Sequence, residues 1–308
     1  MATSPELMTQ QRSRFSVVDL SMVAIALIWG INAPVVKGSM VGWDPLAYNA
    51  LRFAAAAIVL FVFVVSTDRN WRLRGKDLWA VIVLGAVGNG VYQYLFIAGM
   101  ARAAAANISL IIDMAPLAVT LWSGLTGLDR INRWIAGGAV LSVAGVVMVA
   151  LGGDGGLHLS GSALVGDTMA LGAMICWAAY TVYAQPLMER VGSSLRVTAW
   201  TMLVGAAFNL AIGVPALLRQ DYHVVTWLSA GGMAFSALFS LVVSYVVYAW
   251  AVTRIGAVRT AIYLSLVPIL AALFAWVMIG ERWVLMQWAG SILVVFGVTV
   301  AKLESHQS

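Results

Sequence analysis

The stretch "DLSMVAIALIWGINAPVVK", residues 19–37, is apolar enough to cross a membrane, yet its second half is unusual for a membrane helix. Trp29, Gly30, Asn32 and Pro34 follow one another closely, and the stretch ends on Lys37. Polar groups inside a bilayer are costly and usually face a bundle interior or a cavity. The stretch therefore predicts a membrane helix with one face on a polar site.

A second stretch, "DTMALGAMICWAAYTVYAQ" at residues 167–185, repeats this pattern. Asp19 and Asp167 are 148 residues apart, and so are Trp29 and Trp177. We expect each Asp to cap the start of its helix, where a carboxylate favours the positive end of the helix dipole. Further pairs at an offset of 152 are Arg102–Arg254, Pro116–Pro268, Asp129–Glu281, Arg130–Arg282, Gly138–Gly290 and Gly145–Gly297. The order of these pairs predicts a duplicated chain.

The composition places the whole chain in a bilayer. Of its 308 residues 62% are hydrophobic and 10% charged, with a mean hydropathy of +0.91, whereas a soluble domain has about 25% charged residues. Runs of about 20 apolar residues predict an all-α membrane protein with spans near 17–38, 45–66, 78–100, 103–124, 132–152, 163–186, 195–218, 225–252, 257–279 and 283–302.

Five spans in each half make the second half enter the membrane from the opposite side. We therefore expect ten transmembrane helices as two inverted five-helix repeats around a central cavity, a common plan of secondary transporters. The predicted parts are an N-terminal tail at 1–16, the first repeat at 17–152, an extracytoplasmic linker at 153–162, the second repeat at 163–303 and a C-terminal tail at 304–308.

The charges indicate an orientation and argue against nucleic acid as a partner. The net charge is +5, but the basic residues are spread over short loops and do not form one face. With the N-terminus inside, thirteen Lys and Arg residues fall on the inner side and four on the outer side. The positive-inside rule then predicts an inner-membrane protein with both termini cytoplasmic. The first sixteen residues lack a signal-peptide pattern.

Catalytic and metal chemistry have little support in the sequence. Cys176 is the single cysteine, so no internal disulfide can form, and His158, His223 and His306 all fall in predicted loops or the tail. We expect no catalytic cluster, no metal site and no cofactor. An intramembrane enzyme and a channel remain the rival classes.

The two repeated Trp residues are expected near the membrane centre. Asp19 and Trp29 are ten residues apart, about 15 Å along a helix, which is half the hydrocarbon thickness. Trp29 and Trp177 either flank a central site or face lipid and pack between helices. Spans one, three, four, six, eight and nine are expected around this site. The predicted lining residues are Trp29, Asn32, Asn89, Tyr92, Gln93, Asp113, Trp177, Tyr180, Ser244, Tyr245, Tyr248 and Tyr263.

Spans five and ten are nearly apolar and rich in glycine, so they are expected outside the site as packing helices. Their glycines would allow packing within one chain or between chains, and the oligomeric state stays open. Asp113 is the one carboxylate deep in a predicted span. It is expected to bind a substrate ammonium group, to carry a coupling proton, or to pack, for example paired with Arg52.

This duplicated pattern resembles the drug/metabolite transporter superfamily in its EamA-type ten-helix branch. The resemblance rests on the early Trp29 and Trp177, on Pro116 and Pro268, and on the acidic corner at Gly280 and Glu281, degenerate as Leu128 and Asp129. It implies export of small metabolites by alternating access without ATP, and it is greatest to the bacterial aromatic amino acid exporters. An aromatic wall with hydroxyls suits apolar or aromatic amino acids; nucleosides, cationic drugs and other small solutes are the alternative cargo.

Overall fold

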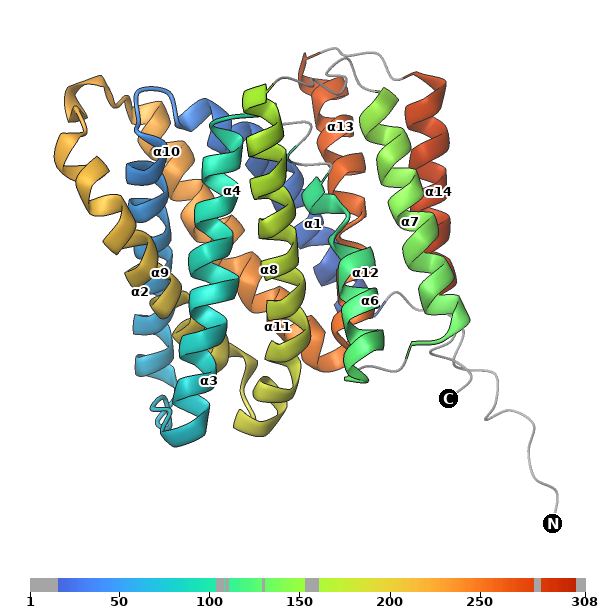
Figure 1. Ribbon diagram of the computed structural model, residues 1–308, viewed down its shortest axis with the longest axis horizontal. Coiled ribbons are helices and arrows are strands. Elements are labelled where there is room, and N and C mark those ends of the chain that lie inside the picture. Colours follow the sequence, from blue (N-terminus) through green and yellow to red (C-terminus); the bar gives the residue numbers. More distant parts are fainter. Residues whose placement is uncertain are drawn as a thin grey trace.

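The computed structural model describes residues 16–103, 108, 111–128, 131–152, 161–279 and 284–302, and its regular elements there are all helices (Figure 1). Several expectations lie outside these residues: the two tails, most of the linker, and the pairs Asp129–Glu281 and Arg130–Arg282.

The first half contains five helical stretches, two of them interrupted. The elements are α1 (Val17–Ser39), α2 (Pro45–Thr67), α3 (Gly75–Gly85), the π-helical segment η2 (Ala86–Val91), α4 (Tyr92–Met100), α6 (Ala115–Thr126) and α7 (Arg133–Gly152). η2 joins α3 and α4 into one continuous rod, and a turn at Met114 separates α6 from the helical residues 111–113.

The second half follows the same order. Its elements are α8 (Gly161–Val191), α9 (Ser194–Arg219), the 3-10 turn η3 (Tyr222–Val224), α10 (Trp227–Phe235), the π-helical segment η4 (Ser236–Val243), α11 (Ser244–Ile255), α12 (Ala257–Tyr263), α13 (Leu266–Ile279) and α14 (Leu285–Lys302). Here η4 joins α10 to α11, and a turn at Leu264 and Ser265 separates α12 from α13.

The chain is a multi-pass membrane protein. Among the described residues, six helical stretches are long and apolar enough to span a bilayer: Val17–Val36, Pro45–Thr67, Gly75–Met100, Leu164–Val191, Ser194–Arg219 and Trp227–Ile255. Four shorter apolar helices accompany them.

The starts of α1 and α8 differ, although the sequence pairs them. At α1 the backbone N–H of Asp19 donates to Ser16 Oγ at 3.2 Å, and the Ser16 N–H donates to Asp19 Oδ2 at 2.9 Å. This reciprocal capping box agrees with the role expected for Asp19. The expectation for Asp167 is wrong, because α8 begins at Gly161 and places Asp167 inside the helix.

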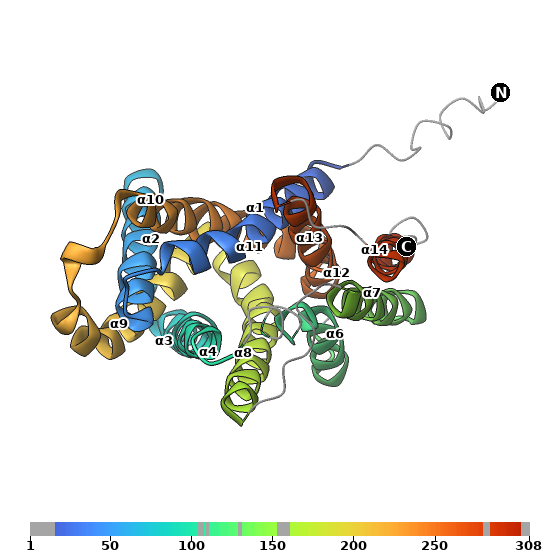
Figure 2. The same cartoon turned by 90° about the horizontal axis from the view of Figure 1, so that it is seen from above.

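The two glycine-rich helices α7 and α14 pack against each other at one end of the molecule (Figures 1 and 2). A Cβ on Gly138 would lie 2.6 Å from the Gly297 carbonyl oxygen, and one on Gly145 would lie 2.5 Å from that of Gly290. Real side chains do not come that close, so only glycine permits this approach. The glycines therefore pack within one chain.

The middle of the molecule is formed by α1, α4, α8 and α11. α1 packs along α10, η4 and α11, while α8 packs along η2 and α4. At one face the Ser229 hydroxyl donates to the carbonyl of Ser39, so the end of α1 meets the start of α10. α1 and the α10–α11 rod are thus antiparallel, and α11 ends toward the face where α1 begins.

Candidate functional site

Six aromatic side chains meet in the middle of the molecule, and we call them the aromatic box: Trp29, Tyr92, Trp177, Tyr180, Tyr245 and Tyr248. Trp177 is its centre. Its ring centroid lies 5.2 Å from that of Tyr248, 5.4 Å from that of Tyr245, 5.3 Å from that of Tyr92 and 5.7 Å from that of Tyr180. The two repeated Trp residues also touch, edge to face, with centroids 6.2 Å apart.

Helical spacing and one π-helical segment place these rings. Trp177 and Tyr180 are one turn apart on α8, and Tyr245 and Tyr248 are one turn apart on α11, so each pair shares a face. Trp29 enters from α1, where its Nε1–H donates to the carbonyl of Ser240 at 3.0 Å. Ser240 lies in η4, and π-helical segments inside longer helices are frequent at functional sites.

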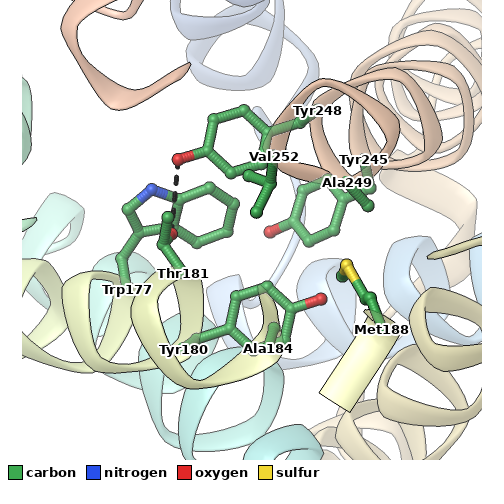
Figure 3. A pocket seen from close by; sticks show the side chains of 9 residues that line it. All are labelled: Trp177, Tyr180, Thr181, Ala184, Met188, Tyr245, Tyr248, Ala249 and Val252. Carbon is green, nitrogen blue, oxygen red and sulfur yellow. Dashed lines mark hydrogen bonds between the residues drawn. The ribbon is translucent and has the colours of Figure 1, made fainter. Parts of the chain in front are cut away.

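The box borders a small pocket between α8 and α11. Trp177, Tyr180, Thr181, Ala184 and Met188 line one side, and Tyr245, Tyr248, Ala249 and Val252 line the other (Figure 3). The Thr181 and Tyr248 hydroxyls are hydrogen-bonded across it at 3.3 Å. The empty space of the pocket is about 240 Å³, which includes open space at its mouth.

The pocket extends toward one membrane face. It runs from Trp177 to Met188 and Val252, each three residues before the end of its helix. That is the face where α1 begins, because α1 and the α10–α11 rod are antiparallel.

Gln93 connects the box to a buried polar cluster. Its Nε2 donates to the Tyr245 hydroxyl at 3.3 Å, and its Oε1 accepts from Arg52 Nη2 at 2.8 Å. Arg52 also donates to Asn49 and Ser236. Among the described residues Arg52 forms no ion pair with Asp113, so the suggested pairing of these two residues is wrong.

Asp113 lies outside the aromatic box. It is the last helical residue before the turn at Met114 and sits within electrostatic range of the Tyr92 hydroxyl. Arg52 is also within electrostatic range of that hydroxyl. One basic and one acidic side chain therefore both act on the Tyr92 hydroxyl.

Besides Gln93 and Asp113, four more of the predicted lining residues are not in the aromatic box. Tyr263 donates its hydroxyl to Asp19, and Ser244 donates to the Phe239 carbonyl at 2.9 Å, so it serves its own helix. Asn89 is fully buried in η2 within reach of the Tyr180 hydroxyl, but neither polar atom meets a partner at good hydrogen-bond geometry. Asn32 is half-buried on α1, and its Oδ1 is buried without a partner.

Thr181 lies on the helix face of Trp177 as its spacing predicts, whereas Met188 is a lining residue that is not among the predicted ones. Thr181 follows Trp177 by four residues and Met188 follows it by eleven, so both lie on the face that Trp177 marks. That spacing was the available signal. No group of three or more His, Cys, Asp or Glu that could hold a metal ion occurs within the residues the structure describes.

Comparison with known proteins gives consistent results. The model of the EamA-like transporter family matches residues 16–151 and 164–302. The uncharacterized transporter YyaM of Bacillus subtilis is 25% identical over 290 residues, covering 92% of this chain and 93% of its own. An uncharacterized transporter of Archaeoglobus fulgidus is 26% identical, covering 95% and 99% of the two chains. One crystal structure shares the fold with a TM-score of 0.78 at 20% identity, covering 96% of this chain and 98% of its own.

Proposed function

The chain belongs to the EamA-like transporter family, and from that premise we propose that it exports amino acids with apolar or aromatic side chains by alternating access. The family and the relatives named as transporters make the chain a small-solute transporter and not an enzyme. The export direction, the cargo and the mechanism are the proposal.

The aromatic box carries this proposal. Tyr and Trp rings offer apolar faces for an aromatic or aliphatic side chain, and tyrosine hydroxyls both donate and accept hydrogen bonds. The pocket beside Trp177 and Tyr245 combines these properties. Trp29, Tyr92, Tyr180 and Tyr248 complete the proposed binding surface, with the Asp113 carboxyl placed to receive the ammonium group.

An inverted repeat gives the proposed mechanism its geometry. We assign ten spans, residues 17–152 and 163–303, as two five-helix repeats in a bacterial inner membrane with both termini cytoplasmic. Support comes from η2 and η4, whose last residues Val91 and Val243 are 152 apart, and from the mutual glycine contacts of α7 and α14. In this orientation the pocket extends toward the cytoplasm, the side from which an exporter takes its cargo.

Organic cations are a second candidate cargo. Tryptophan and tyrosine faces attract cations, and the box offers six such rings with Asp113 beside Tyr92. A cationic drug would use these two features without needing a partner for a carboxylate.

Release of labelled solutes from proteoliposomes tests the proposal. Vesicles containing the purified chain and loaded with labelled phenylalanine, tryptophan, threonine, uridine or a quaternary aromatic cation should release the apolar and aromatic amino acids fastest, with saturation. Preferential release of the cation would support the second candidate. Release of uridine alone would contradict both.

A further inference from the structure

Arg52 is the largest fully buried side chain of the described residues and carries a positive charge inside the helix bundle. It is 1% exposed and lies seven residues into α2, about 10 Å along the helix. Its guanidinium donates to Ser236 Oγ at 3.0 Å, to Asn49 Oδ1 at 3.0 Å and to Gln93 Oε1 at 2.8 Å. These partners are all neutral.

The charge of Arg52 is therefore uncompensated in this state. Neither the Asp68–Arg196 nor the Asp77–Arg190 ion pair includes it. Burying a lone guanidinium is unfavourable even when some of its hydrogen bonds are satisfied. The Arg52 Nε–H also has no acceptor, although it is buried. The site thus lacks an anion, which a bound ligand can supply.

A short path connects this guanidinium to the pocket. Gln93 contacts Arg52 with its carbonyl oxygen and Tyr245 with its amide nitrogen. Tyr245 lines the pocket and contacts both Trp29 and Trp177. One side chain, Gln93, therefore separates the positive charge from the ring that a cargo would touch.

The amide oxygen of Gln93 accepts from Arg52 where a carboxylate oxygen could accept instead. An amide oxygen and a carboxylate oxygen accept from a guanidinium in the same way, but the charged acceptor forms the shorter and stronger bond. A carboxylate entering the pocket beside Tyr245 can replace Gln93 Oε1 on Arg52. Gln93 can then return when the cargo leaves. The guanidinium therefore has an acceptor both with and without cargo.

We propose that Arg52 binds the carboxylate of the transported molecule, and that Gln93 fills this position when the site is empty. The inference rests on the proposed export of amino acids and specifies it: the cargo must carry a free carboxylate. Arg52 and Asp113, both within electrostatic range of Tyr92, then match the two charges of a zwitterion. Amides and amines of the same size are excluded because they cannot neutralise Arg52.

The test compares phenylalanine, phenylalaninamide and phenethylamine, each labelled, in proteoliposomes of the wild type, Arg52→Gln and Arg52→Lys. The wild type should transport phenylalanine in preference to both analogues. Arg52→Gln should reduce that preference about tenfold or more, the size expected for one charge-assisted hydrogen bond. Arg52→Lys keeps the charge and should restore part of the preference.

Asn209→Ala provides the matched control. Asn209 is buried in the same cluster, accepting from Asn49 and donating to the carbonyls of Asn89 and Gly205, but it does not contact Arg52. Its removal should lower the melting temperature and leave the preference for phenylalanine unchanged. An equal change of preference in Arg52→Gln and Asn209→Ala would overturn the assignment.

The outcomes separate this inference from the proposed function. Equal transport of acid and amide by the wild type overturns the role of Arg52 and leaves amino acid export standing. A wild type that transports none of the three overturns both. If Arg52→Gln does not fold, protection of the wild type against thermal unfolding decides: phenylalanine must protect better than phenylalaninamide, and equal protection contradicts the inference.

Discussion

Trp29 connects the two halves of the chain through a single side chain. Its ring contacts Trp177, Tyr245 and Tyr248 of the second half, and its Nε1–H reaches the Ser240 carbonyl. The side chain is only half-buried, so its removal should affect cargo binding more than folding. We expect Trp29→Ala to lower amino acid flux about tenfold while the yield of folded protein stays near wild type, measured by proteoliposome release and gel filtration.

Trp29→Phe separates the ring from its hydrogen bond, because it keeps an aromatic face and loses the donor to Ser240. It should retain more flux than Trp29→Ala. Trp177→Ala is the contrasting variant: Trp177 is 4% exposed and contacts five rings, so a loss of about 3–5 kcal/mol of stability is expected. Wild-type flux in Trp29→Ala would show that Trp29 only packs.

Residue roles could be predicted from the sequence where the repeat constrains them and not elsewhere. The matching offset of Trp29 and Trp177 pointed to a shared location, and their rings touch. Tyr263 is a polar aromatic residue within a predicted span, which suggests a lining role. Its hydroxyl instead donates to Asp19 at the start of α1. Whether this hydroxyl faces the pocket or bonds to Asp19 depends on the packing of α1 against α12, which periodicity does not encode.

The close contact between α7 and α14 depends on glycines, which carry a hydrogen atom where other residues carry a Cβ. A methyl group on Gly145 would meet the Gly290 carbonyl oxygen and the backbone nitrogen of Val294 at 2.5 and 2.7 Å. The two helices must then separate. We expect Gly145→Ala to reduce folded yield and melting temperature strongly, measured by fluorescence-detected gel filtration.

Gly137→Ala is the matched control, since a Cβ there meets nothing within 4 Å. It lies on the same helix and adds the same methyl group. It should fold as well as wild type or slightly better, because alanine has the higher helix propensity. Equal loss in both variants would show that the contact with α14 is not the cause of the loss in Gly145→Ala.

At the level of whole helices the sequence was informative about location and not about irregularity. Apolar runs placed most of the helices within a few residues, since membrane insertion requires such runs. The exceptions are the predicted span 103–124, in which α6 begins only at Ala115, and α8, which continues to Val191 beyond the predicted end at residue 186. η2 and η4 were not anticipated, because a π-helical segment inserts one residue per turn without a composition of its own. Asp167 shows the same limit, because α8 begins at Gly161 and Asp167 lies inside the helix.

Across the whole molecule, an ion pair ties the loop after α2 to the start of α9. Arg196 Nε and Nη2 donate to Asp68 Oδ2 at 2.9 and 2.7 Å. These bonds, followed by that from the Asn70 backbone N–H, hold the pKa of the Asp68 carboxyl below its usual value. A carboxyl with a lowered folded pKa adds stability above its unfolded pKa of about 3.9, and that contribution is lost as the pH falls through the folded pKa.

Asp68→Asn should therefore lower the melting temperature at pH 7, and the difference from wild type should shrink as the pH falls below about 4. Thermal unfolding in detergent across this range measures it. Asp77→Asn is the comparison, because the Asp77–Arg190 pair is more exposed, with side chains 33% and 56% accessible, and exposed pairs contribute little. A difference that persists unchanged at low pH would exclude the ion pair as its cause.

The contact between α1 and α10 offers a test of alternating access itself. A Cβ on Gly232 would lie 2.6 Å from the Ser39 Cβ, whereas a disulfide needs about 3.8 Å, so a separation of about 1 Å lets the two positions be bridged. In a Cys176→Ala background, Ser39→Cys with Gly232→Cys should cross-link on oxidation. If transport requires the halves to part at this face, the oxidised protein should stop releasing amino acids and recover after reduction. Each single-cysteine variant, oxidised in the same way, should keep its flux. Full flux through the cross-linked protein would mean that this face stays closed throughout the cycle, and rocking of the two halves would have to be abandoned.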